Sequence, residues 1–400
     1  KARGICTIVC DGNPQGPAKE GADIVYHVDV RRTEEIADIC RREQVDGILT
    51  AFSDLLLECM VKIADKAGLP CYLKPEQLSY YRDKAVMKDM FGRLGIPTPR
   101  YVETGAELSG ETLGDLRFPV VTKPLDRYGS RGVLVLDSLE EIRGRFHEIC
   151  AGSETEKILL EEYDPGYEFN LMAWVHDSQV YVLGIADREK SPGEPHSIPV
   201  CSRNIYPSRL IGRVYGDAKQ ILEKVIAFTG QTEGELSMQF FWNPDRGIQV
   251  CEIAARFLGY EHELIEYASG FSLEELLLNS IYAPALVPAM LEKHDPHFDR
   301  SCAVLYFHGR ERIVGSLAAA RECMRFPEVR QGWLFYQEGE KVQEFARPYV
   351  ARCFLQPGAR ENIDLATDKL FAAMSVPDEN GEELLYRNVR MQYPEDEPAR

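Results

Sequence analysis

The residues whose types and spacing could do chemistry are concentrated in the stretch 237–259, SMQFFWNPDRGIQVCEIAARFLG. Turn-forming residues at 243–247 separate two apolar runs, which predicts two neighbouring strands joined by a tight turn. This hairpin would bring Gln239, Glu252 and Arg256 together. Mg²⁺ prefers oxygen ligands and often keeps substrate phosphates in its shell, and a guanidinium binds phosphate or carboxylate oxygens in pairs. The pattern indicates metal and nucleotide chemistry, although a core hairpin with polar residues at its rim explains the same residues.

Length and composition limit the class of protein. The chain has 400 residues, 44% of them hydrophobic and 28% charged, which is ordinary for a globular protein of two or three domains. Its formal net charge is −18, whereas nucleic acids and anionic membranes require a basic surface. We therefore expect small-molecule or protein partners, with no nucleic acid and no membrane.

The cysteines indicate the compartment. There are 11, an odd number without a CxxC pair, and most stand beside apolar residues. Such cysteines are typical of small buried side chains in a reducing compartment. The sequence also has no signal peptide and no apolar run of about 18 residues. We expect a cytoplasmic protein without disulfides or zinc.

Strand and helix patterns alternate through the first 95 residues, which predicts a parallel sheet. We expect strands at 4–10, 23–28, 47–51 and 70–73, and helices at 33–42, 54–67 and 79–95. Doubly wound units usually begin with a strand and a glycine-rich turn, and no such turn follows the first strand here. The domain is therefore expected to begin at its second strand.

A glycine-bearing turn follows the predicted strand 118–123. Its residues Tyr128, Gly129, Ser130, Arg131, Gly132 and Val133 lead into another strand, and Lys123 lies at its base. Glycines let backbone N–H groups approach phosphate oxygens. The apolar strand 157–163 ends in Glu161, Glu162 and Tyr163, and Glu168 follows, which suits adenine and ribose binding. An ordinary hairpin turn and solvated strand ends remain the alternatives.

Taken in order, these segments resemble the ATP-grasp superfamily. The resemblance covers residues 80–279, and the flanking parts resemble the branch of biotin carboxylase, the carbamoyl-phosphate synthase large subunit and the L-amino acid ligases. It implies a mixed α/β and α+β protein. An N-terminal α/β domain would cover 1–95, an ATP-grasp domain 96–290 with its lid at about 100–170, and a biotin-carboxylase-like α+β domain 291–400 with a disordered acidic tail.

The resemblance also implies roles for individual residues. Lys84 and Lys123 would contact ATP phosphates, and residues 128–133 would form the lid loop. Adenine would lie against Glu161, Glu162 and Tyr163, ribose against Glu168, and Mg²⁺, or Mn²⁺ in its place, against Gln239 and Glu252. Arg256 would face an acyl phosphate. One position departs from the family pattern, because Ala254 stands where an asparagine metal ligand is usual.

The implied activity is an ATP-dependent carboxylate–amine ligase, with amino acids as candidate substrates. A non-catalytic ATP-binding regulatory or scaffold protein, and an enzyme that forms carboxyphosphate, are the alternatives. Residues 187–208 contain four prolines and predict a long loop that lines the acceptor site, with His196 and Arg203 as candidates. His262 is a third candidate, and a homodimer is compatible with the resemblance.

The last hundred residues read as a supporting domain. We expect strands at 302–307 and 333–336 and a helix at 362–374.

Overall fold

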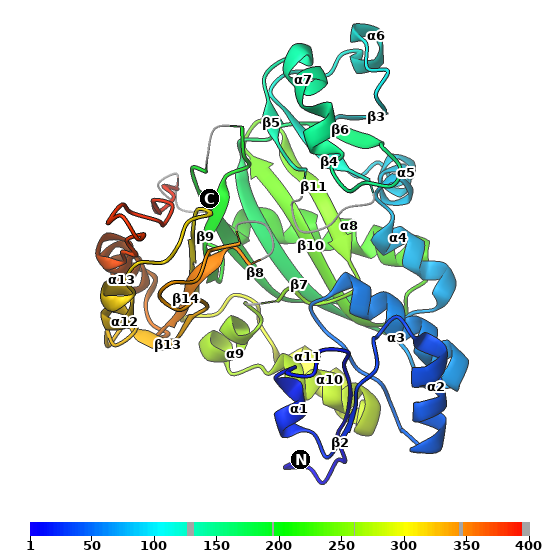
Figure 1. Ribbon diagram of the computed structural model, residues 1–400. Helices are drawn as coiled ribbons and strands as arrows, with labels where there is room; N and C mark the ends of the chain where they lie inside the picture. Colours follow the sequence, from blue (N-terminus) through cyan, green and yellow to red (C-terminus); the bar gives the residue numbers. More distant parts are fainter. Residues whose placement is uncertain (126–131, 194–195, 260, 344–346, 394–400) are drawn as a thin grey trace.

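The computed structural model describes residues 1–400 except 126–131, 194–195, 260, 344–346 and 394–400. The strands of the described residues form a two-stranded, a four-stranded and an eight-stranded sheet. In Figure 1 the four-stranded sheet lies above the large central sheet, the N-terminal segment lies below it and the C-terminal segment lies beside it. The fold is the mixed α/β architecture that the sequence predicts.

The N-terminal segment contains a short parallel pair, β1 (Ile8–Cys10) and β2 (Ile24–Tyr26), with α1 (Ala18–Gly21), α2 (Thr33–Arg42) and α3 (Asp54–Ala67). The helices at 33–42 and 54–67 lie where they were expected. The prediction of strands at 47–51 and 70–73 is wrong. Neither segment joins a sheet, and both pack against distant parts of the chain. Gly47 lies against Ile281, and the Tyr72 hydroxyl donates to the carbonyl of Ala255.

The expected helix at 79–95 is divided. After η1 (Pro75–Gln77) the chain forms α4 (Leu78–Arg82) and then α5 (Lys84–Leu94). Asp83 interrupts them with an extended backbone, and its carboxylate accepts hydrogen bonds from the N–H groups of Ala85 and Val86. A carboxylate at this position stabilises a helix start. Lys84 is therefore the first residue of a capped helix.

The four-stranded sheet, which we call the lid, has the order β3-β6-β4-β5 and is antiparallel. Its strands are β3 (Tyr101–Thr104), β4 (Val120–Pro124), β5 (Val135–Leu136) and β6 (Ile158–Glu162), and its helices are α6 (Gly110–Leu113) and α7 (Leu139–Ile149). Alternate residues of a strand face opposite sides. Val120 packs in the lid core, so Val121 and Lys123 face away from it.

The eight-stranded sheet has the order β11-β10-β7-β8-β9-β12-β14-β13, with antiparallel neighbours throughout. Its strands are β7 (Tyr167–His176), β8 (Gln179–Ser191), β9 (Val200–Tyr206), β10 (Glu233–Asn243), β11 (Gly247–Ala254), β12 (Cys302–His308), β13 (Val329–Leu334) and β14 (Tyr349–Leu355). The hairpin at 237–259 is confirmed. The prediction of a long loop at 187–208 is wrong, because most of this segment belongs to β8 and β9.

Helices cover both faces of this sheet. Phe169 and Leu171 of β7 pack with α8 (Ile211–Thr229), whereas Met172 and Trp174 pack with the group formed by α9 (Glu263–Ser269), α10 (Leu273–Tyr282), η2 (Pro284–Leu286) and α11 (Val287–Lys293). This alternation follows the period of a strand. The face of β7 and β10 that carries Glu168 and Gln239 is therefore the one turned away from α8.

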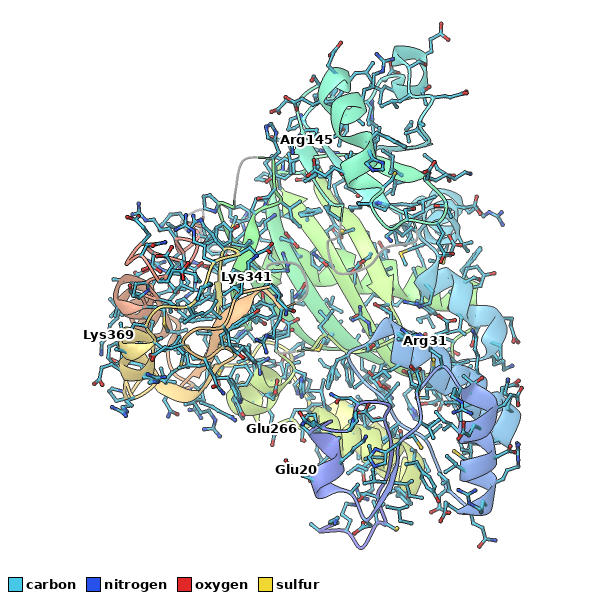
Figure 2. All side chains as sticks on the ribbon, viewed as in Figure 1. Glu20, Arg31, Arg145, Glu266, Lys341 and Lys369 are labelled. Carbon is cyan, nitrogen blue, oxygen red and sulfur yellow. The ribbon has the colours of Figure 1, made fainter. Side chains whose placement is uncertain are left out.

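The C-terminal strands extend the same sheet and are covered by α12 (Ala318–Cys323) and α13 (Arg360–Ala373). The expected strand 302–307 and helix 362–374 are present, while the strand expected at 333–336 ends at Leu334. Charged side chains such as Arg145 on α7 and Lys369 on α13 lie at the periphery (Figure 2). Among the described residues, no helix combines the length and apolar character that a membrane crossing needs.

Candidate active site

Ten of the predicted residues meet in a cavity of about 390 Å³ between the lid, α4 and α5, and the open face of the large sheet. Its walls include predicted residues from all of these parts: Lys84, Lys123, Val133, Glu161, Glu162, Tyr163, Glu168, Gln239, Glu252 and Arg256. We call this cavity the cleft. Segments about 170 residues apart thus contribute to one site.

The β10–β11 hairpin supplies the oxygen ligands. Gln239 and Glu252 are cross-strand partners beside a register shift at Phe240, and both line the cleft. The amide nitrogen of Gln239 donates a hydrogen bond to Glu168, so its amide oxygen faces away from that carboxylate. Ala254 lies two residues after Glu252 and also lines the cleft. A carboxylate and an amide oxygen fit a hard divalent cation, with water or phosphate completing its shell.

Cationic groups face the hairpin from the lid and α5. Lys123 Nζ donates to Glu161, and Lys84 Nζ lies 3.4 Å from the carbonyl oxygens of Pro124 and Leu125. Burial lowers the pKa of Lys84. Burial also opposes the charge on Lys123, but Cys251 and Glu161 outweigh it and raise the pKa of this ammonium group. Both lysines are placed to offset phosphate charge.

Glu161 is the centre of a buried ion-pair cluster. Its carboxylate pairs with Lys123 and, at 2.6 Å, with Lys88 of α5. Burial would raise the pKa of Glu161, but Lys123 and Lys88 lower it to about 2. The carboxylate is therefore ionised, and it fixes Lys123 in the cleft wall.

The neighbouring Glu162 points elsewhere. Its carboxylate accepts from the Arg117 backbone N–H at 3.1 Å and pairs with the Arg117 side chain. Because successive strand residues face opposite sides, the Glu161 carboxylate lies in the cleft while that of Glu162 lies against Arg117. Glu162 also lines the cleft, and its role in nucleotide binding stays a prediction. Tyr163 ends the segment 161–163, which we call the hinge, and its N–H donates to the carbonyl of Pro119 at 3.0 Å.

Glu168 is held by two cations of β8. Arg188 Nη1 lies 2.8 Å and Lys190 Nζ 2.7 Å from its carboxylate oxygens. Burial alone would raise the pKa of Glu168. Arg188 and Lys190 outweigh this effect and lower the pKa below its ordinary value, so the carboxylate is ionised. Arg188 and Lys190 share one face of β8 and line the cleft.

Arg256 lies beyond the end of β11. Its Nε and Nη2 atoms lie 2.8 and 2.9 Å from the two carboxylate oxygens of Asp54, the first residue of α3. Burial disfavours the guanidinium charge, but Asp54 raises its pKa. The side chains of both residues are partly exposed toward the cleft.

The three substrate candidates lie outside the cleft. Arg203 is fully buried on β9, where it pairs with Glu189 at 2.5 Å and Asp364 at 2.7 Å, so its proposed role in substrate binding is wrong. His262 stacks on Phe52 and pairs with Glu274. His196 lies beside Glu141 of the lid, and its carbonyl accepts from Val135.

The glycine-bearing lid loop is described in part. Tyr128, Gly129, Ser130 and Arg131 lie outside the described residues. Gly132 has a φ of +73°, and a Cβ there would meet the carbonyl oxygen of Ile149 at 2.3 Å, so glycine is required. Val133 lines the cleft.

The sequence analysis missed four cleft residues that form ion pairs with predicted site residues: Asp54, Lys88, Arg188 and Lys190. Lys88 follows Lys84 by four residues, so the two share a helix face, and this spacing could have revealed it. Arg188 and Lys190 alternate as strand residues do, but the assignment of 187–208 to a loop hid the pattern. Asp54 carries no local signal, because its partner lies about 200 residues away.

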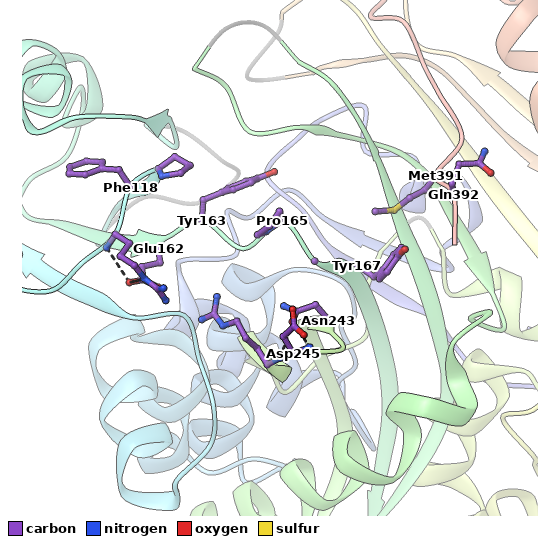
Figure 3. Close-up of a pocket in the computed structure, with 13 residues that line it drawn as sticks. Phe118, Glu162, Tyr163, Pro165, Tyr167, Asn243, Asp245, Met391 and Gln392 are labelled. Atoms are coloured by element: carbon purple, nitrogen blue, oxygen red, sulfur yellow. Dashed lines mark hydrogen bonds and ion pairs between the residues drawn. The ribbon is translucent and has the colours of Figure 1, made fainter. Parts of the chain in front are cut away.

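A second pocket of about 660 Å³ lies on the other side of the hinge (Figure 3). Phe118, Tyr163, Pro165 and Tyr167 form much of its wall, with Met391 and Gln392 from the C-terminal segment. It lacks the lysines and the Gln239–Glu252 pair of the cleft. The chemistry indicated by the sequence therefore belongs to the smaller cavity.

Known proteins with similar sequences are ligases, although no family model matches the chain. The 3-methyl-D-ornithine–L-lysine ligase of Methanosarcina barkeri is 24% identical over 286 residues, 70% of this chain and 68% of the relative. The phosphoribosylamine–glycine ligase of Lactococcus lactis is 23% identical over 272 residues, 64% of each chain. The match to the latter thus covers less than two thirds of its length.

Solved structures share the fold over nearly the whole chain. The L-amino acid ligase of Bacillus licheniformis superposes with a TM-score of 0.77 at 18% identity, covering 94% of this chain and 93% of that one. The biotin carboxylase domain of the Hydrogenobacter thermophilus 2-oxoglutarate carboxylase, solved with MgADP, ADP and bicarbonate, has a TM-score of 0.68 at 15% identity, covering 96% and 86%.

The chain therefore has the ATP-grasp fold. The proteins to which it is similar in sequence and in structure are ATP-grasp ligases.

Proposed function

We propose that the chain is an ATP-dependent carboxylate–amine ligase that forms an amide-type bond and releases ADP and phosphate. The observation that carries this proposal is the convergence of Lys84, Lys123, Glu252, Gln239 and Arg256 on one cavity of about 390 Å³. Phosphoryl transfer depends chiefly on positioning and charge stabilisation, which these groups can supply without a covalent nucleophile.

ATP is expected to place its adenine against the hinge at 161–163 and its ribose near Glu168. Lys84 and Lys123 then offset the phosphate charge. Gln239 and Glu252 would hold Mg²⁺, or Mn²⁺ in its place, and this ion would neutralise further charge on the triphosphate. A hard cation fits the donor set, because the Gln239 amide oxygen is turned away from Glu168 and the Glu252 carboxylate lines the cleft.

In the proposed reaction an oxygen of the substrate carboxylate attacks the γ-phosphorus of ATP, and ADP leaves. The amine then attacks the acyl carbon of the acyl phosphate, and phosphate leaves. Arg256 is placed to hold oxygens of the intermediate, because a guanidinium offers paired N–H donors. Closure of the lid would exclude water that hydrolyses the intermediate.

Amino acids are the substrate class that we favour. One relative joins 3-methyl-D-ornithine to L-lysine, and one structural neighbour is an L-amino acid ligase. We also propose that the enzyme acts in the cytoplasm and forms a homodimer. Release of ADP and phosphate, measured across a panel of amino acids, small carboxylates and bicarbonate, tests the reaction class.

One observation favours the non-catalytic alternative. Ala254 lines the cleft at the position where the ATP-grasp pattern that this sequence resembles has an asparagine, and its methyl group cannot coordinate a metal. Binding of ATP without phosphate release for any member of the panel would support an ATP-binding regulatory protein. Release with bicarbonate alone would instead indicate a carboxyphosphate-forming enzyme.

A further inference from the structure

The backbone on both sides of Arg256 is held by two residues that lie outside the cleft. The N–H of Phe257 donates to Glu235 Oε2 at 2.7 Å, and the Tyr72 hydroxyl donates to the carbonyl oxygen of Ala255 at 3.0 Å. Tyr72 and Glu235 also lie within reach of each other, with 3.4 Å between their oxygens. The two residues thus contact the peptide groups immediately before and after Arg256.

The contact between Tyr72 and β10 depends on a glycine. Gly234 has a φ of +98°, and a Cβ there would lie 2.2 Å from Cγ of the Tyr72 ring. A side chain at 234 would therefore displace the tyrosine. Tyr72 belongs to the segment between α3 and α4, so the N-terminal segment reaches the Arg256 loop at this point.

The hydrogen bonds form a directional chain when Glu235 is neutral. Burial raises the pKa of Glu235 to about 8, although Phe257, Tyr72 and Arg256 oppose this shift. A carboxylic acid at this position can accept from Phe257 and donate to the Tyr72 oxygen, which leaves the tyrosine hydrogen for Ala255. The carboxylic acid, the tyrosine hydroxyl and the two peptide groups then all have a partner, which favours a single arrangement of the loop.

We propose that Tyr72 and Glu235 are positioning residues that set the orientation of Arg256 toward the γ-phosphate and the acyl phosphate. Asp54 holds the guanidinium itself at 2.8 and 2.9 Å, so Arg256 is oriented through its backbone and its side chain by residues of the N-terminal segment. The inference rests on the proposed function of Arg256. An ordinary buried hydrogen bond between elements would stabilise the fold without a selective effect on turnover.

Tyr72→Phe removes a single oxygen and keeps the ring against Gly234. We expect substrate-dependent phosphate release to fall at least about tenfold in kcat while ATP affinity changes by less than about twofold, because the lost effect concerns the transition state. Tyr336→Phe is the matched control, since the Tyr336 hydroxyl also donates to a backbone carbonyl, that of Arg347, and Tyr336 does not line the cleft. The control should retain the parent kcat.

A double-mutant cycle separates the positioning role from a general loss of structure. If Tyr72 acts through Arg256, Tyr72→Phe should have little further effect in an Arg256→Lys background, because coupled residues are non-additive. Equal losses in both backgrounds, or a parent-like kcat for Tyr72→Phe, would overturn the inference.

Binding of inorganic phosphate to the protein loaded with ADP and Mg²⁺ gives a readout without turnover. Calorimetry should show that Tyr72→Phe weakens phosphate binding at least about fivefold, as Arg256→Lys does, while Tyr336→Phe leaves it unchanged. If the parent protein binds phosphate but catalyses no reaction with any substrate, the proposed reaction is contradicted. The comparison of phosphate affinities among the variants would still test the positioning role of Tyr72. Unchanged phosphate affinity in Tyr72→Phe, or no phosphate binding by the parent, overturns the inference.

Discussion

Asp54 and Arg256 form a two-point ion pair across more than 200 residues of sequence, with Nε to Oδ1 at 2.8 Å and Nη2 to Oδ2 at 2.9 Å. Asp54 begins α3 in the N-terminal segment, and Arg256 follows the last strand of the cleft hairpin. One edge of the guanidinium is thus fixed by a carboxylate. The Nη1 group donates to the carbonyl of Phe257 at 3.3 Å. A substrate oxygen that binds Arg256 must therefore share N–H donors with Asp54 or with the Phe257 carbonyl, and these contacts already orient the guanidinium.

Arg256→Lys should separate catalysis from nucleotide binding. A lysine keeps the charge but cannot hold two oxygens in a plane. We expect ATP affinity to stay within about threefold of the parent and substrate-dependent phosphate release to fall at least about a hundredfold, because the contact is made chiefly after ATP has bound. Calorimetry and a phosphate assay measure the two effects.

Arg145→Lys on α7 is the control for that substitution, since Arg145 lies on the lid surface and pairs with Glu148. Loss of ATP binding in Arg256→Lys, with turnover in proportion to occupancy, would make Arg256 a nucleotide ligand instead.

Lys123→Ala should weaken ATP binding by more than about tenfold, because a charge partner lost from a buried site costs roughly 2–5 kcal/mol. The same substitution at Lys157, which pairs with Glu103 on the lid surface, should leave the affinity unchanged. Calorimetry with ATP and Mg²⁺ compares the two variants. An affinity equal to that of the parent would place the nucleotide elsewhere.

Glu252→Gln should raise the Mg²⁺ concentration needed for half-maximal ATP binding by about tenfold, because an amide oxygen replaces a charged ligand. Glu266→Gln serves as the control, since Glu266 is exposed on α9. Titration with Mg²⁺ at a fixed ATP concentration measures how ATP binding depends on the Mg²⁺ concentration. A curve that superposes on that of the parent would remove Glu252 from the metal site.

Lys88→Met should destabilise the protein by about 3 kcal/mol, the lower end of the range for a broken buried ion pair, because Lys123 remains beside Glu161. Adding Glu161→Gln together with Lys123→Met should recover most of this loss, since none of the three residues is then left charged without a partner. Urea unfolding measures both variants. A triple variant no more stable than Lys88→Met would show that the three residues are not coupled.

Stability should fall as pH rises from about 4.5, the ordinary pKa of a glutamate, to about 8 because of Glu261. Burial raises the pKa of this carboxyl to about 8, although Asn170, Arg188 and Asn204 oppose the shift. The native protein therefore keeps a proton that the unfolded chain has released. The stabilisation is complete below the unfolded pKa and is lost as pH rises through 8, at no more than about 1.4 kcal/mol per pH unit.

Glu261→Gln should flatten this dependence, which thermal unfolding between about pH 5 and pH 9 can measure. Asn170 and Asn204 both donate to Glu261, so the substitution also changes one hydrogen bond at every pH. A slope as steep as that of the parent would exclude Glu261 as its source.

Local patterns predicted the parts of the site that each lie within one element. The hairpin that carries Gln239 and Glu252 and the strand that carries Glu161 are marked by turn residues and apolar runs. Lys84 was predicted inside a single helix, whereas it is the first residue of α5. Their convergence came from the resemblance to a family, because spacing alone does not show which elements meet.

The segment 187–208 shows why the rest could not be predicted. Both faces of β8 carry charges there: Arg188 and Lys190 on the cleft side, Asp187 and Glu189 on the other. The buried acids are stabilised by Arg203 and by Arg360, which is more than 150 residues away. Strands are predicted from the alternation of apolar and polar residues, and the distant ion-pair partners of buried charges cannot be seen in that alternation. The charged part of β8 was therefore predicted to be a loop.

The large sheet also sets an order in which the chain can fold. Its middle strand β9 pairs with β8 on one side and with β12 on the other, and β12 begins at Cys302. While the chain is being synthesised, β9 therefore presents an unpaired edge until about a hundred more residues have left the ribosome. An open edge is a template for pairing with other chains. A nascent chain that already contains every cleft residue through Arg256 thus still exposes the β9 edge to pairing with other chains until β12 arrives.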